Sequence, residues 1–98
     1  MRDPERIERL FVCCRTRKHF SAWCRAEGVP ENGDHILWVN DLSVLAGHSG
    51  MHYHALMSSP DWQELAAGCY ALGGRWALGS EINLWSERVR AAAGSSRG

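Results

Sequence analysis

The 98-residue chain has no apolar run that approaches the roughly 18 residues of a membrane-spanning helix. Its first ten residues, MRDPERIERL, are charged and lack the apolar core of a signal peptide. Its four cysteines form no Cys-x-x-Cys pair and no zinc-ribbon spacing. These absences predict a cytoplasmic protein whose cysteines are free and buried, with no membrane span.

Motifs for catalysis and nucleotide binding are also missing. A phosphatase loop after Cys13 or Cys14 would need arginine where His19 or Phe20 stands. The segment CRTRK has no glycine, which excludes a Walker A motif and a G-x-G-x-x-G fingerprint there. No nucleophile elbow, carboxylate pair or complete Cys-His arrangement is evident. We therefore predict no catalytic residue and no cofactor.

Histidines are close together in one part of the chain. His52 and His54 would share one face of a strand, and His48 precedes them. No carboxylate or cysteine joins them at a recognisable spacing, so we predict ordinary histidines and no metal site. Cys13 and Cys14 would point to opposite faces of a strand and could not easily bind one ion.

The formal net charge is zero, but the charges are unevenly distributed. Residues 1–25 carry seven basic and three acidic side chains, whereas residues 26–87 carry one basic and eight acidic side chains. Nucleic-acid binders usually present a net basic surface. A helix-turn-helix is also disfavoured, because HILWVNDL is rich in strand-forming residues. We therefore do not expect a nucleic-acid partner.

Three short apolar runs, RLFVCC (9–14), HILWV (35–39) and MHYHALM (51–57), predict buried strands. Between the first two, Thr16 can cap a helix that ends at Gly28. Asn40 and Asp41 can cap a short helical segment over 42–46. Asp3-Pro4 predicts one helical turn over residues 4–8.

Two further helices are expected after the third strand. Ser59 and Pro60 are typical of a helix start, and the apolar stripe predicts a helix over 60–76. Ser80 can cap a last helix over 81–93. Residues 94–98, GSSRG, are expected to be a disordered polar tail, so residues 1–93 form a single domain.

This order of elements predicts a small α/β fold. Buried strands that alternate with helices form parallel sheets with helices on both faces. We expect three parallel strands in the order 2-1-3, with the first strand central, and an additional C-terminal helix. The expected core is Leu10, Val12, Phe20, Trp23, Ile36, Trp38, Leu45, Leu56, Leu65, Cys69 and Leu72.

The carboxyl ends of the strands are the usual ligand edge of such a sheet. Basic residues there, at a helix N-terminus, would attract an anion. The residues that could bind a phosphorylated molecule or nucleotide are Arg15, Thr16, Arg17, Lys18, Asn40, Asp41 and Ser59.

The last helix carries an apolar stripe formed by Leu78, Ile82, Trp85 and Val89. Two other helices are already expected to cover the faces of a three-stranded sheet. Leaving large apolar side chains exposed costs roughly 1.5–3 kcal/mol each. We therefore predict that this stripe packs on a second copy and forms a homodimer. The alternative is that the helix folds back over the edge of its own sheet and the protein is a monomer.

Residues 10–50 resemble small uncharacterised Rossmann-like α/β accessory proteins of actinobacterial phages and prophages. The resemblance is carried by Thr16, Phe20, Trp23-Cys24-Arg25, the strand at 36–39 and Leu45-Ala46-Gly47. It implies a phage accessory role and assigns no functional residue. Together with the missing catalytic motifs and the five tryptophans, it favours a non-enzymatic protein that binds another protein, such as a host protein. The alternative is the phosphorylated small ligand.

Overall fold

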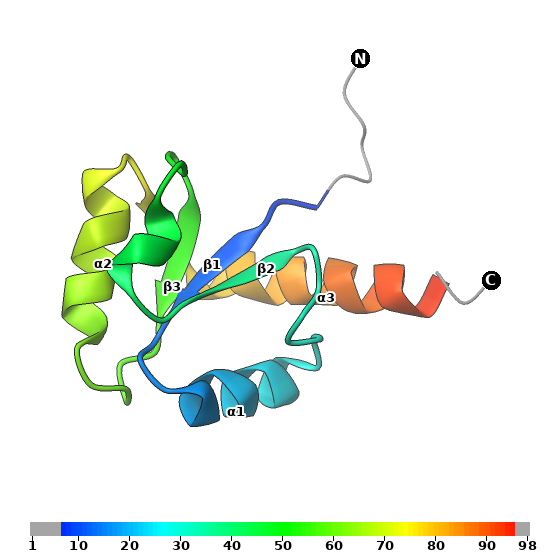
Figure 1. Ribbon diagram of the computed structural model, residues 1–98. Helices are drawn as coiled ribbons and strands as arrows, with labels where there is room; N and C mark the ends of the chain where they lie inside the picture. Colours follow the sequence, from blue (N-terminus) through cyan, green and yellow to red (C-terminus); the bar gives the residue numbers. More distant parts are fainter. Residues whose placement is uncertain (1–6, 96–98) are drawn as a thin grey trace, which may run out of the picture.

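A sheet lies at the centre of the molecule (Figure 1). It has four strands. The computed structural model describes residues 7–95, with side chains to residue 92. The strands are β1 (Leu10–Cys13), β2 (Ile36–Val39), β3 (His52–Ala55) and β4 (Arg75–Trp76). They lie in the order β2-β1-β3-β4, and every neighbouring pair is parallel. The predicted α/β class and the order 2-1-3 are confirmed, whereas the predicted number of strands is wrong.

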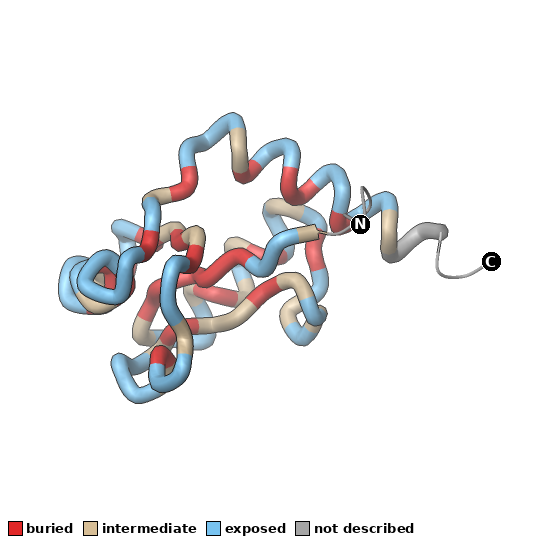
Figure 2. Tube along the Cα trace, turned by 90° about the horizontal axis from the view of Figure 1, so that it is seen from above, coloured by how far each residue is buried: buried red, intermediate tan, exposed pale blue. Residues whose placement is uncertain are grey.

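Helices cover both faces of the sheet (Figure 1). The α1 helix (Arg17–Glu27) and the α3 helix (Gly79–Ser95) lie on one face. The α2 helix (Trp62–Ala71) and the 3-10 turn η1 (Leu42–Leu45) lie on the other. Alternate residues along β1 and just after it therefore enter different cores: Val12 and Cys14 face α1 and α3, and Cys13 faces α2. In Figure 2 the buried segments run through the middle of the molecule.

The predicted core is largely correct. Most of its members are buried in one of the two layers. Trp23 and Trp38 are half-buried at the border of the first layer. Leu72 is 40% exposed, because α2 ends one residue before it.

The α1 helix has the ends that its sequence predicts. Thr16 is extended at the N-cap, and its hydroxyl accepts a hydrogen bond from the His19 amide. Gly28 ends the helix in the left-handed region at φ 72°, which glycine adopts without strain. The short segment at 42–46 is also found, as η1, with Asp41 as its cap.

The β4 strand replaces the end of the predicted helix over 60–76. Gly73 adopts φ 83°, and its amide donates to the Tyr70 carbonyl, which ends α2. The next amide, of Gly74, donates to the Cys69 carbonyl. Arg75 then donates to the Met51 carbonyl at 2.8 Å and starts the parallel ladder with β3. The two glycines therefore terminate the helix rather than weaken it.

The predicted caps of the last two helices are also wrong. Ser59 is buried and its hydroxyl accepts a hydrogen bond from the Arg15 amide at 3.0 Å, so it does not cap α2. The α2 helix begins at Trp62, after Asp61 at φ 59°. The α3 helix begins at Gly79 rather than after Ser80, and Glu81 accepts from the Leu78 amide at 2.8 Å.

The two ends of the predicted domain differ from expectation where they are described. The α3 helix continues through residues 94 and 95, which were expected to belong to the tail. Residues 96–98 lie outside the described residues, as do residues 4–6 of the predicted first turn. Residues 7 and 8 of that turn are described and are not helical.

The apolar stripe of α3 packs on the protein's own sheet. Ile82, Trp85 and Val89 are buried in the layer that α3 shares with α1. The Trp85 indole donates to the Glu8 carbonyl at 2.9 Å, which ties α3 to the start of β1. The prediction that this stripe needs a second copy is therefore wrong, because α1 alone does not cover one face of a four-stranded sheet. Leu78 remains 60% exposed, and a homodimer stays a prediction.

Candidate functional site

Four of the predicted ligand residues meet at the carboxyl ends of the strands. Arg15 follows β1, and its Nη1 donates to the Asn40 carbonyl and to Asp41 Oδ1, both at 3.4 Å. Its backbone amide donates to the Ser59 hydroxyl. The loops after β1, β2 and β3 are thus joined through one arginine, as expected for the edge where parallel strands end.

Two acidic residues near the start of α2 complete this group. Arg15 Nη2 lies 3.2 Å from Glu64 Oε2, and Arg15 Nε lies 3.8 Å from Asp61 Oδ2. The sequence placed Asp41 at this edge but did not indicate Glu64, which lies 49 residues after Arg15. We call Arg15, Asp41, Asp61 and Glu64 the Arg15 cluster.

The charge of the Arg15 cluster opposes the binding of an anion. Three carboxylates surround one guanidinium, so the cluster is net negative. Hydrogen bonds from the Ser43 hydroxyl and amide lower the pKa of Asp41, and Arg15 lowers it further. The carboxylate is therefore ionised at neutral pH and would repel a phosphate.

The remaining predicted ligand residues do not join this cluster. Thr16 caps α1 and contacts the His19 ring. Arg17 Nη2 lies 3.6 Å from Glu31 Oε1, with its side chain 69% exposed. Lys18 is exposed and has no ion pair within residues 7–92. The seven predicted ligand residues are therefore divided between the surroundings of Arg15 and the start of α1, and an anion site there stays a prediction.

The three clustered histidines lie in different surroundings. His48 packs edge-on against Phe11, with ring centroids 5.2 Å apart. His52 Nδ1 lies 2.6 Å from Glu8 Oε2. His54 lies between Trp23 and Trp76, and its buried Nδ1 has no hydrogen-bond partner among the described residues. In the part of the chain that the structure describes, no three histidine, cysteine or acidic side chains are grouped as metal ligands would be.

All four cysteines are free and buried, as predicted. Burial raises the pKa of the Cys14 thiol to about 11 and that of Cys24 to about 12. Cys13 and Cys69 contact each other with their sulfur atoms 3.6 Å apart, and this hydrogen bond together with burial raises the pKa of Cys13. The thiols of Cys13, Cys14 and Cys24 are therefore protonated at neutral pH, and all four thiols are inaccessible, which makes them poor nucleophiles.

A hollow of about 320 Å³ lies beside the outer edge of β2. The rings of Phe20 and Trp38 stack against each other in its wall, with centroids 5.3 Å apart. The Trp38 indole donates to the Cys14 carbonyl at 2.8 Å, which fixes the ring. The residues that line the hollow are Arg17, Phe20, Glu31, Asn32, Gly33, Ile36, Leu37 and Trp38.

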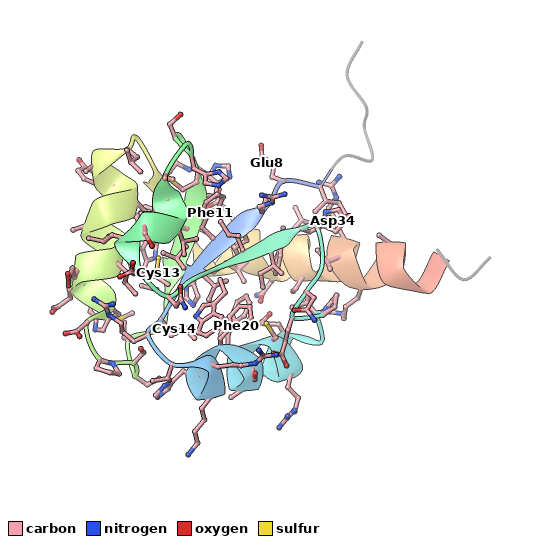
Figure 3. All side chains as sticks on the ribbon, viewed as in Figure 1. Glu8, Phe11, Cys13, Cys14, Phe20 and Asp34 are labelled. Atoms are coloured by element: carbon pink, nitrogen blue, oxygen red, sulfur yellow. The ribbon has the colours of Figure 1, made fainter. Side chains whose placement is uncertain are left out.

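The rim of the hollow is held in place by polar contacts. Glu31 accepts a hydrogen bond from the Ser21 hydroxyl at 2.8 Å and pairs with Arg17. These contacts attach the loop before β2 to α1. Figure 3 shows Phe20 of α1 pointing toward the sheet and Asp34 at the start of β2. The sequence placed Trp38 in the core and gave no sign of the hollow, although the predicted order already made its strand an edge.

No family model, curated protein or solved structure matches this chain. Within residues 7–95, no helix combines the length and apolar character needed to cross a membrane.

Proposed function

We propose that the protein is a non-enzymatic binding protein and that another protein docks at the open edge of β2. One observation carries this proposal: a strand edge without a neighbour runs beside a hollow with an aromatic wall. Edge strands with free backbone groups are templates for pairing with another chain. Pockets beside such an edge supply specificity for alternate side chains of the added strand.

The backbone of β2 supports docking at this edge. The Leu10 amide donates to the His35 carbonyl, and the Cys14 amide donates to the Val39 carbonyl. In a parallel ladder these bonds direct the amides and carbonyls of Leu37 and Val39 toward β1. Those of Trp38 therefore face outward, and within residues 7–95 no strand pairs with them.

The alternative, a phosphorylated small ligand, has less support. The residues expected to bind it are divided between the net negative Arg15 cluster and the exposed start of α1. An anion would have to displace carboxylates from the guanidinium of Arg15. A protein partner requires no such displacement.

The same proposal includes the source of the partner and the compartment in which the protein acts. The resemblance of residues 10–50 to phage accessory proteins supports a partner in the bacterial host. Free, buried thiols are compatible with work in the reducing cytoplasm.

A selection from a random peptide library tests the proposed function. Cys24 and Cys69 divide the chain into three segments suited to chemical synthesis and ligation at cysteine. A chain with an N-methyl group on the Trp38 amide can thus be made with every side chain intact, and the unmodified synthetic chain is its control. Selected peptides should bind the control at least about tenfold more tightly, a difference of about 1.4 kcal/mol. Equal binding to both chains, or no enriched peptide, would overturn the proposal.

A further inference from the structure

Acidic residues lie at both ends of the β2 edge. Asp34 precedes the strand, and its side chain forms no ion pair within residues 7–92, although the Arg9 guanidinium donates to its backbone carbonyl at 3.2 Å. Asp41 follows the strand, within the net negative Arg15 cluster. Among the residues that line the hollow, the one acidic side chain, Glu31, is paired with Arg17.

Resting on the proposed function, we propose that the partner contributes an extended basic segment, which adds to β2 as a fifth strand and places an apolar side chain in the hollow. The proposal combines three properties of one edge: outward backbone groups, an apolar wall and acidic ends. A second copy of the chain would fit poorly. Antiparallel pairing of two β2 edges would bring the acidic end of one copy near the acidic end of the other.

The hydrogen-bonding requirement is met by any extended chain. The outward amide and carbonyl of Trp38 need an acceptor and a donor from the added strand. A strand uses only alternate residues for bonds to one neighbour, because successive amides point to opposite sides. The amides of one alternate set in the added segment must therefore be free to bond with β2. The amides of the other set point away from β2 and are not needed for pairing.

The side-chain requirement is met by one apolar residue. Trp38 and Ile36 face the layer of α1, and so does the side chain of a residue added beside them. The hollow, at about 320 Å³, is at the lower end of the range for small-molecule sites, which is about 300–1,000 Å³. It suits a side chain delivered by a strand better than a whole cofactor.

The charge requirement selects the class of segment. Lysine or arginine residues flanking the apolar residue would lie near Asp34 at one end and near Asp41 and Glu64 at the other. Complementary charge raises the association rate and excludes acidic competitors. The effect must weaken as salt is added, because the side chains of Asp41 and Glu64 are more than half exposed and Asp34 is exposed.

Two synthetic peptides of opposite charge, KVKLKVK and EVELEVE, test this inference by titration into ¹⁵N-labelled protein. The basic peptide should bind at least about tenfold more tightly. Its binding should slow the exchange of the Trp38 amide and leave that of Leu37 unchanged. Asp34→Lys should weaken binding of KVKLKVK severalfold, whereas Glu87→Lys, the same charge change on an exposed position of α3, should not.

N-methylation of KVKLKVK separates strand addition from simple charge attraction. Methyl groups on one alternate set of amides should abolish binding, and methyl groups on the other set should be tolerated. Equal binding of both methylated peptides would overturn strand addition. Tighter binding of EVELEVE with protection of Trp38 would overturn the basic partner while leaving the proposed function intact. Binding of neither peptide, while peptides selected from the library still require the Trp38 amide, would also overturn only the basic partner.

Discussion

The rings of Phe20 and Trp38 stack with their planes only 9° apart and their centroids 5.3 Å apart. Phe20 comes from α1, and Trp38 comes from the edge strand β2. One aromatic pair therefore attaches the helix to the sheet and forms the wall of the hollow. The proposed binding surface and the stability of this edge depend on the same two rings.

Phe20→Ala should destabilise the protein by about 3–5 kcal/mol, as other buried phenylalanine truncations do. The Phe20 side chain is only 3% exposed and is buried in the layer under α1. Denaturation by urea would measure the change. The control is Tyr70→Ala, because Tyr70 is 72% exposed and should change stability by no more than about 0.5 kcal/mol. Equal effects of the two substitutions would contradict the described packing.

Arg15→Gln should lower the melting temperature, and the loss should be larger at low ionic strength than in molar salt. The substitution leaves three carboxylates near one another without their common cation, and salt screens their repulsion. Arg17→Gln, which removes one exposed ion pair, should have a smaller effect.

The same thermal measurements address the phosphate alternative. Nucleotides and sugar phosphates should leave the melting temperature of the wild type unchanged. A ligand at a hundredfold excess over its Kd would add about 2.7 kcal/mol. If a phosphate compound raised the melting temperature and Arg15→Gln or Arg17→Gln abolished that rise, the result would favour the phosphorylated ligand instead.

Stability should fall as the pH drops through the range in which His54 is titrated. Burial lowers the pKa of His54 in the folded protein, and nearby Glu27 only partly opposes this. The contribution of neutral His54 is complete above the unfolded pKa of about 6.5 and is lost as the pH falls below it toward the folded pKa. His54→Phe keeps an aromatic ring and should flatten this part of the pH profile. His48→Phe is the matched control. If His48→Phe flattened the pH profile and His54→Phe did not, His54 would be excluded as the cause.

Gly74→Ala should destabilise the protein more than Gly47→Ala. A β-carbon at Gly74 would lie 2.6 Å from the Cys69 carbonyl oxygen and 2.9 Å from the Met51 sulfur. At Gly47, with φ 83° and no atom within 4 Å, the cost is only that of the left-handed backbone, about 1–2 kcal/mol. Chemical denaturation would rank the two variants. The reverse order would contradict the turn that leads into β4.

The elements predicted correctly from the sequence are those whose structure depends on residues close to one another along the chain. Thr16 and Gly28 delimit α1 through contacts within a few residues of themselves. The alternation of Cys13 and Cys14 between two cores follows from the period of a strand. The central position of β1 in the order of the first three strands agrees with its continuous apolar run.

The errors arose where distant residues decide the structure. Gly73 and Gly74 interrupt a helical pattern, but only pairing with β3 turns the next residues into β4. The apolar stripe of α3 was predicted to need a second copy because the sequence did not reveal the fourth strand, which widens the face of the sheet that α3 covers. Glu64 enters the Arg15 cluster only because the start of α2 reaches the carboxyl ends of the strands. No local pattern in the sequence contains that information.

The edge of β2 is tested most directly by residue-resolved amide hydrogen exchange of the free protein and of its complex with a library-selected peptide. In the free protein, the Trp38 amide should exchange quickly, whereas the neighbouring Leu37 and Val39 amides, which face β1, should exchange slowly. In the complex, Trp38 should become as protected as its neighbours. A Trp38 amide that is already protected in the free protein, or that stays unprotected in the complex, would contradict the account.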